Sequence, residues 1–216
     1  MFAVFQLNKR DKSEKLLTKI VGKKEHAAEL GNAIPTKPLL FSKPVSSYIS
    51  EGETIKIPEG CTNLQHEIEL GLVIGKRAQK ISKTNAMDYV AGYALALDMT
   101  ARDFQELAKK QGNPWLLAKG FDTSCPVSDF IDKSRIADPY DLTLWCKVNG
   151  LLKQKGSTSQ MIFDFPTILF YITKFITLEP GDLVLTGTPS GVSTVKSGDE
   201  ITCGIENIVE MKFTIE

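Results

Sequence analysis

The chain has 216 residues, 42% of them hydrophobic, which is enough to bury the core of one large domain. Lysine plus arginine and aspartate plus glutamate each number 26, and this zero net charge argues against a nucleic acid or an anionic membrane as the main partner. The four cysteines are scattered without a C-x-x-C spacing, which disfavours zinc and favours reduced thiols, and no apolar run is long enough to span a bilayer.

The N-terminal stretch has a weak targeting character. Basic residues are frequent in residues 1–21, but Asp11 and Glu14 interrupt them and serine is scarce. This composition is a marginal organelle-targeting signal.

A short helix is expected over residues 22–32, closed by Gly31 and Asn32. His26 and Glu29 are three residues apart and share a face of this helix, where they can hydrogen-bond. A carboxylate that orients an imidazole prepares a general base. The alternative is a surface histidine with a chance acidic neighbour.

The stretch from Leu64 to Gly75 alternates acidic and apolar residues and then becomes an apolar run, which predicts a β-strand. In a strand, Glu67 and Glu69 project from the same face. A second apolar strand is predicted to end in Asp98. Three carboxylates form an all-oxygen set that suits a hard ion such as Mg²⁺. The alternative is a solvated acidic face, but the apolar surroundings predict burial, and buried acids need partners.

A helix is expected after Asp98, because the residues from Thr100 to Asp103 resemble a capping box. Arg102 and Gln105 are three residues apart at the start of this helix and can offer donors to an anionic substrate. An ordinary exposed helix face is the alternative for this pair.

Lys119 stands in an otherwise apolar run from Trp115 to Phe121. A semi-buried lysine needs an anion, and beside a metal site it serves as an electrophile or proton donor. A surface lysine that lays its stem along apolar neighbours is the alternative.

The C-terminal part is rich in predicted strands. A hairpin with a type I′ turn is expected around Asn149-Gly150, followed by a helix over residues 165–175. The apolar strand over residues 183–186 leads into a glycine-framed loop, in which the Thr188 hydroxyl and backbone amides can hold a carboxylate. Many short strands, few helices and no βαβ alternation predict an α+β fold that is mainly β, with short helical insertions.

Six motifs, in this order, resemble the fumarylacetoacetate hydrolase family. Within that family they are most similar to the domain-containing protein 1 subgroup, the acylpyruvases with oxaloacetate decarboxylase activity. The resemblance covers roughly residues 19–216, which implies one domain over these residues and an N-terminal extension over residues 1–18. The motifs are His26-x-x-Glu29, Phe41-x-Lys43-Pro44, His66-Glu67-Ile68-Glu69-Leu70, the run from Ala96 to Asp103, Trp115-x-x-Ala118-Lys119, and Leu185-Thr186-Gly187-Thr188-Pro189-x-Gly191-Val192.

The resemblance implies a β-roll of mixed sheets in a single catalytic domain, a homodimer, and bound Mg²⁺ or Mn²⁺. It also implies roles for individual residues. These are Glu67, Glu69 and Asp98 for the metal, His26, Glu29 and Lys119 for catalysis, and Lys43, Arg102, Gln105 and Thr188 for substrate binding.

The activity that the resemblance implies concerns small 2-oxo acids. It is the hydrolysis of 3-acylpyruvates, such as acetylpyruvate and fumarylpyruvate, to pyruvate and a carboxylate, together with the decarboxylation of oxaloacetate, through a metal-bound pyruvate enolate. Keto–enol tautomerisation of oxaloacetate in the same pocket is an alternative reaction. The implied location is mitochondrial or cytoplasmic, with the mitochondrial one favoured.

One departure from the family pattern concerns the approach to the dyad. The family reads Gly-Arg/Lys-Asn-Tyr plus two residues before the histidine, whereas Gly22-Lys23-Lys24-Glu25 leads directly to His26. Lys23 cannot supply the bidentate fork of an arginine. The sequence therefore leaves open a metal- and ligand-binding homologue with weak catalysis.

Overall fold

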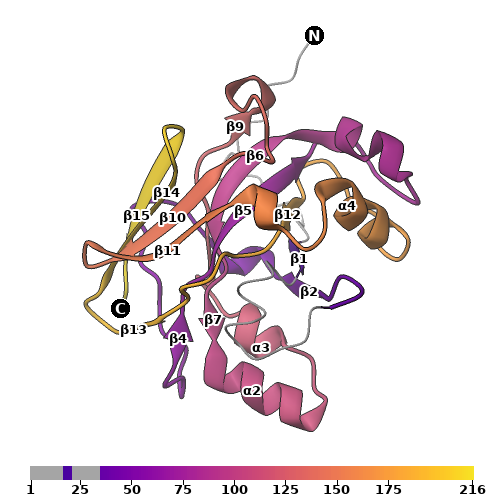
Figure 1. The fold of residues 1–216 in the computed structure, drawn as a ribbon. Helices are drawn as coiled ribbons and strands as arrows, with labels where there is room; N and C mark the ends of the chain where they lie inside the picture. Colours follow the sequence, from indigo (N-terminus) through magenta and orange to yellow (C-terminus); the bar gives the residue numbers. More distant parts are fainter. Residues whose placement is uncertain (1–16, 21–34) are drawn as a thin grey trace.

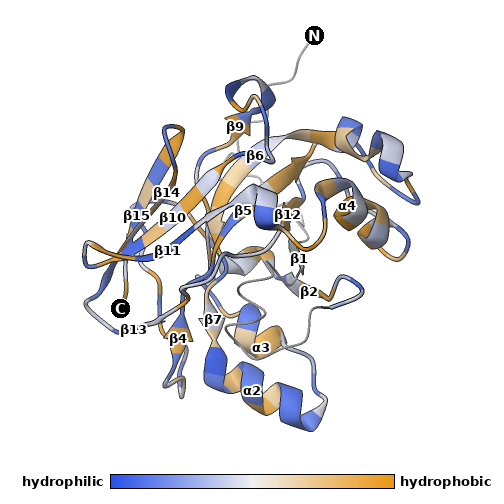
Figure 2. Cartoon of the chain, viewed as in Figure 1, coloured by the Kyte–Doolittle hydropathy of each residue, from blue (hydrophilic) through white to orange (hydrophobic). Residues whose placement is uncertain are grey.

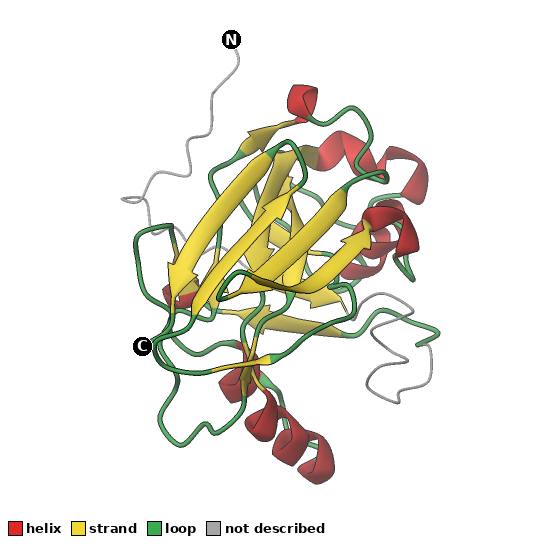
Figure 3. Cartoon of the chain, turned by 60° about the vertical axis from the view of Figure 1, so that its left-hand side comes forward, coloured by secondary structure: helices red, strands yellow, loops and turns green. Residues whose placement is uncertain are grey.

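The computed structural model describes residues 17–20 and 35–216 (Figure 1). Strands dominate and helices are few and short, so the expected mainly β fold is confirmed. Figure 3 shows the strands in the middle of the molecule and the helices at its periphery. In the part of the chain that the structure describes, no helix is long and apolar enough to cross a membrane.

Six strands form the largest sheet. They are β1 Leu17–Ile20, β2 Leu40–Lys43, β5 Ile68–Ile74, β6 Val90–Leu97, β9 Ile131–Asp132 and β12 Leu183–Leu185. Their spatial order is β2-β1-β12-β5-β6-β9, which places β5 between two antiparallel partners, β12 and β6. Every residue of β5 is buried, because both faces of the sheet are covered at this strand, and its sequence accordingly becomes a nearly continuous apolar run.

A second sheet has four antiparallel strands. They are β10 Thr143–Val148, β11 Leu151–Ser157, β14 Glu200–Ile205 and β15 Val209–Thr214, in the order β11-β10-β14-β15. Asn149 and Gly150 join β10 to β11 with φ of 50° and 78°. Positive φ at both central residues is the requirement of a type I′ turn, so the expected hairpin is confirmed.

The helices and the smaller sheets complete the fold. The helices are α2 Arg102–Gln111, α3 Leu116–Lys119 and α4 Phe165–Thr173, with 3₁₀ turns at Val45–Ser47, Lys83–Tyr89, Lys133–Arg135 and Thr158–Gln160. One three-stranded sheet has the order β13-β4-β7, with β4 Leu64–Gln65, β7 Thr100–Ala101 and β13 Thr194–Val195. β3 Tyr48–Ile49 pairs with β8 Cys125–Pro126.

The core lies between the two large sheets. Hydrophobic colouring runs along β5 and β12, whereas the outer helix α2 is mostly hydrophilic (Figure 2). The cysteines are free thiols, as expected, and Cys146 on β10 lies directly opposite Cys203 on β14.

Two local predictions differ from the structure. The single strand expected over residues 64–75 is divided, because β4 belongs to the three-stranded sheet and β5 to the six-stranded one, so the chain changes sheet at His66 and Glu67. The capping box is also wrong. Ala101 is the N-cap of α2, the hydroxyl of Thr100 bonds the carbonyl of Asp98, and Asp103 accepts from the backbone N–H of Thr62.

Candidate metal and substrate site

Three buried carboxylates meet where β5 begins and β6 ends. Glu67 lies just before β5, Glu69 lies within it, and Asp98 directly follows β6. One oxygen from each of the three side chains lies within 4.8 Å of the others. A backbone hydrogen bond of 2.8 Å from the N–H of Asp98 to the carbonyl of Glu67 fixes the two strand ends together. The common face predicted for Glu67 and Glu69 is therefore confirmed, although Glu67 lies outside the strand.

Lys119, the last residue of α3, points into this cluster. Its Nζ lies 2.7 Å from Asp98 Oδ2 and 3.1 Å from Glu67 Oε2, and it also bonds the hydroxyl of Thr100. Only 2% of Lys119 is exposed. The anion that a lysine in an apolar run requires is thus this pair of carboxylates.

Lys43, the last residue of β2, approaches Asp98 from the other side. Its Nζ lies 2.7 Å from Asp98 Oδ1 and donates to the carbonyls of Met99, Lys119 and Ser124. An ammonium group has three protons, and protein oxygens surround this one. This geometry favours a role in fixing Asp98 over the direct substrate contact that the resemblance implies.

Arg102, the first residue of α2, is directed at Glu67. Its Nη2 donates to Glu67 Oε1 at 2.6 Å, its Nη1 to Gln105 Oε1 at 2.5 Å and its Nε to Gln65 Oε1 at 2.7 Å. The expected donor pair of Arg102 and Gln105 is therefore brought together, and the anion that it contacts here is Glu67.

The six charged side chains balance one another. Three carboxylates face two ammonium groups and one guanidinium, and none of the six residues is more than 6% exposed. Their formal charges sum to zero. Three carboxylate oxygens within 4.8 Å of one another form an oxygen donor set that suits Mg²⁺ or Mn²⁺. The residues present therefore fit a divalent metal, with Glu67, Glu69 and Asp98 as the groups that can hold it.

The loop after β12 supports β5. The N–H of Gly187 donates to Glu69 Oε2 at 2.7 Å, so the carboxylate that this loop holds in the structure is the chain's own Glu69. The Thr188 hydroxyl donates to the carbonyl of Ile68 at 2.8 Å and accepts from Gln154 Nε2 at 2.8 Å. Since its single proton is directed to Ile68, the Thr188 hydroxyl has no further proton to donate to a substrate anion in this arrangement.

Gln154 on β11 is a functional-site neighbour that the sequence analysis missed. Its Nε2 also donates to the carbonyl of Pro189, and its Oε1 accepts from the N–H of Ile68 at 3.1 Å and faces His66 Nδ1 at 2.8 Å. The carbonyl of Pro189 can only accept and the N–H of Ile68 can only donate, so the Nε2 and Oε1 ends of the Gln154 amide are both fixed. Because Oε1 is an acceptor, Nδ1 of His66 carries the proton between them. Gln154 thus joins the second sheet to β5 and to the loop that contains Thr188 and Pro189.

Two titratable side chains, those of His66 and Cys146, lie close to Gln154. Burial lowers the pKa of His66, but the hydrogen bonds with Cys146 and Gln154 and the charge of Glu67 outweigh it and leave that pKa raised. The hydrogen bond from Cys203 lowers the pKa of Cys146, and burial opposes this effect. The hydrogen bond with His66 and the charge of His66 lower it further, to about 6. The Nε2 of His66 lies 2.8 Å from the hydroxyl of Ser193, so the ring is held from both sides.

Replacing Gln154 by leucine should lower the free energy of unfolding by about 3 kcal/mol, because it leaves buried polar groups of Ile68, Pro189 and His66 without their partner. Urea denaturation measures the change. Gln111→Leu, at an exposed position at the end of α2, should change stability by less than about 0.5 kcal/mol. Equal midpoints for the two variants would contradict this role.

The dyad proposed from the sequence, His26 and Glu29, lies outside the described residues. So do residues 22–25, where the sequence departs from the family pattern.

Comparison with known proteins decides the family. The family model described as fumarylacetoacetate (FAA) hydrolase, C-terminal, matches residues 15–216. This chain belongs to the fumarylacetoacetate hydrolase family. The match spans both large sheets and every residue of the buried charged cluster.

Individual relatives of the family are similar over nearly the whole chain. Oxaloacetate tautomerase fahd-1, mitochondrial, of Caenorhabditis elegans is 56% identical over 93% of this chain and 96% of its own length. Oxaloacetate decarboxylase, mitochondrial, of Dictyostelium discoideum is 53% identical over 88% of each chain. The structure of fumarylpyruvate hydrolase from Pseudomonas aeruginosa in complex with Mn²⁺ and pyruvate has a TM-score of 0.87 and 31% identity, over 94% of this chain and 89% of that one.

Proposed function

We propose that this member of the fumarylacetoacetate hydrolase family is an enzyme of small 2-oxo acids that acts on oxaloacetate and on 3-acylpyruvates with the help of Mg²⁺ or Mn²⁺. The observation that carries the proposal is the charge of the buried cluster. Its six side chains sum to zero, so a divalent cation gives the site a charge of +2. That charge complements a dianion such as oxaloacetate, or the enolate of pyruvate with its carboxylate.

The reactions share this enolate. In acylpyruvate hydrolysis, water attacks the distal acyl carbonyl, the C–C bond to the pyruvate unit breaks, and the electron pair of that bond forms the enolate, which then takes a proton. In oxaloacetate decarboxylation, CO₂ leaves with the same result and no water is consumed. A bound divalent ion would act as a Lewis acid that stabilises the negative oxygen.

The chain's own residues have separate tasks. Lys119 adds a positive charge beside the oxygen that becomes negative. Lys43 and Arg102 hold Asp98 and Glu67 in place, and His26, oriented by Glu29, draws the proton from water in hydrolysis. Decarboxylation does not require that proton transfer.

Keto–enol tautomerisation of oxaloacetate is the second candidate reaction. It is favoured by the Caenorhabditis elegans relative, which bears the name of this activity. Tautomerisation moves one proton between C3 and the C2 carbonyl oxygen through the enolate of oxaloacetate itself. The negative charge develops on the same C2 oxygen as in the pyruvate enolate, so the same charged cluster can serve it. We also propose a mitochondrial location, supported by the names of the two relatives, and a homodimer.

The test is to measure three reactions with purified protein, namely tautomerisation and decarboxylation of oxaloacetate and hydrolysis of acetylpyruvate. Each is measured with Mg²⁺, with EDTA, and with Mg²⁺ but no protein. We expect EDTA to abolish the protein-dependent rates and added Mg²⁺ to restore them. His26→Ala should lower hydrolysis by about 10²- to 10⁴-fold and leave decarboxylation nearly unchanged. Oxalate binding without any turnover would favour the catalytically weak homologue instead.

A further inference from the structure

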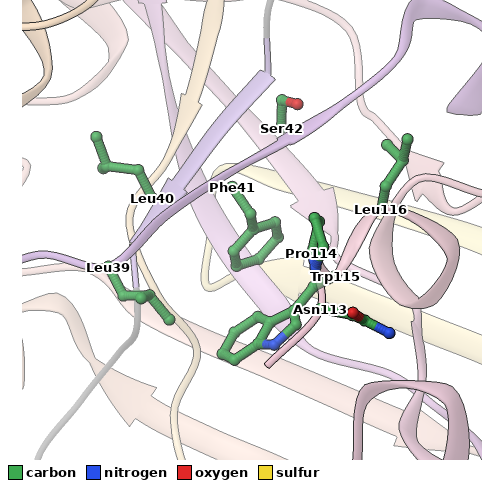
Figure 4. A pocket seen from close by; sticks show the side chains of 8 residues that line it. All are labelled: Leu39, Leu40, Phe41, Ser42, Asn113, Pro114, Trp115 and Leu116. Atoms are coloured by element: carbon green, nitrogen blue, oxygen red, sulfur yellow. The ribbon is translucent and has the colours of Figure 1, made fainter. Parts of the chain in front are cut away.

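A pocket of about 320 Å³ lies between β2 and the segment that leads into α3 (Figure 4). This volume is at the lower end for small-molecule sites and leaves room for one ring or a short chain. Its lining is mainly apolar. The lining residues are Leu39, Leu40, Phe41, Ser42, Asn113, Pro114, Trp115 and Leu116.

Two elements each supply an aromatic residue to this pocket and a lysine to the charged cluster. On β2, Phe41 and Lys43 are two residues apart and project from the same face. At α3, Trp115 and Lys119 are four residues apart, and the N–H of Lys119 bonds the carbonyl of Trp115 at 3.0 Å, so they share one side of the turn. Each aromatic residue therefore lies on the same side of its element as a lysine that contacts Asp98.

The two aromatic rings form a common wall. The centroids of the Phe41 and Trp115 rings are 5.7 Å apart at an interplanar angle of 51°, and Figure 4 shows the rings beside each other. The Nζ of Lys119 lies 5.2 Å from the centroid of the Phe41 ring. Phe41 thus lines the pocket and also lies against the ammonium group that bonds Glu67 and Asp98, so this side chain is common to the pocket and to the surroundings of the charged cluster.

We propose that this pocket binds the acyl substituent of the substrate and selects 3-acylpyruvates with an apolar, planar acyl group such as benzoyl. The inference rests on the proposed function, because it places the 2-oxo acid end at the charged cluster. An aromatic acyl group would bury its ring against Phe41 and Trp115, whereas a distal carboxylate, as in a fumaryl group, would lose hydration there. The pocket therefore distinguishes among acyl groups, whereas the cluster recognises the part that all substrates share.

The experiment measures binding rather than turnover. The Mn²⁺-loaded protein is titrated in a calorimeter with pyruvate and with 4-phenyl-2-oxobutanoate, which has the same 2-oxo acid end, an apolar ring, and no second carbonyl to hydrolyse. Burying the ring should make the phenyl compound bind about tenfold more tightly than pyruvate. Trp115→Ala should reduce this preference to about twofold or less.

Leu116 and Leu117 provide a matched pair of variants. They are neighbours on α3 and both are exposed, at 53% and 76%, but only Leu116 lines the pocket. Leu116→Ala should lower the preference for the phenyl compound about threefold, and Leu117→Ala should leave it unchanged. Equal effects of the two variants, or a wild type without preference, would overturn the pocket proposal.

Pyruvate serves as the check on the proposed function. Binding of pyruvate without a preference for the phenyl compound overturns the acyl pocket alone. If the loaded protein binds neither compound and turns over neither oxaloacetate nor acetylpyruvate, the proposed function fails and the acyl pocket fails with it.

Discussion

Replacing Glu69 by glutamine should weaken Mn²⁺ binding by at least about 100-fold and abolish turnover of both oxaloacetate and acetylpyruvate. Changing a residue that merely supports a metal ligand costs about 10- to 100-fold in affinity, so the loss of a ligand charge should cost more. The glutamine keeps the size of the side chain, and its carbonyl oxygen can still accept from the N–H of Gly187. The effect should therefore come from charge rather than from unfolding.

Calorimetric titration with Mn²⁺ measures the affinity, and circular dichroism checks that the variant is folded. Glu106→Gln is the control, because Glu106 is an exposed residue of α2. It should bind Mn²⁺ like the wild type. A folded Glu69→Gln variant with unchanged Mn²⁺ affinity would remove Glu69 from the metal site.

Replacing Lys119 by methionine should separate metal binding from catalysis. The ammonium group contacts Glu67 and Asp98, two of the three carboxylates that can hold the metal, so it competes with the cation for them. Without it, Mn²⁺ should bind at least as tightly as in the wild type. Turnover of oxaloacetate and acetylpyruvate should nevertheless fall about 10²- to 10³-fold, because a charge that stabilises the enolate is lost.

Lys110→Met provides the control for this substitution, because Lys110 is exposed near the end of α2. Its turnover and Mn²⁺ affinity should equal those of the wild type. Lys119→Arg should not restore activity, since a planar guanidinium cannot occupy the place of a compact ammonium group. If Mn²⁺ affinity fell in parallel with turnover in Lys119→Met, Lys119 would be a structural support of the ligands and not an electrophile.

The parts of the site that the sequence predicts are those that depend on local periodicity. Glu67 and Glu69 stand two residues apart at the entry of a strand, and Asp98 follows another apolar strand, so their convergence needs only that the two strands be neighbours. An anion beside Lys119 was predicted for a similar reason, because the apolar run in which this lysine stands offers it no partner. Burial then forces each of these charges toward an opposite one.

Contacts between distant segments were not predictable in this way. Gln154 contacts His66 across 88 residues of sequence, and nothing in the pattern of β11 distinguishes it from a surface residue of a hairpin strand. The partner of Arg102 within the protein was also missed, because no local pattern indicates that the start of this helix lies beside Glu67. The break at His66 and Glu67 had no local marker either, since only the pairing of β4 with a different sheet creates it.

The balance of three positive and three negative side chains has a consequence for how the protein is maintained. Some small metal sites leave their domain unfolded until the ion arrives, because their ligands have no other partners. Here each carboxylate has a partner in the protein: Lys43 and Lys119 for Asp98, Arg102 for Glu67, and Gly187 for Glu69. We therefore expect the domain to fold without a metal ion. With the metal dependence that we propose, its activity would then follow the supply of free divalent cations, without a new round of folding.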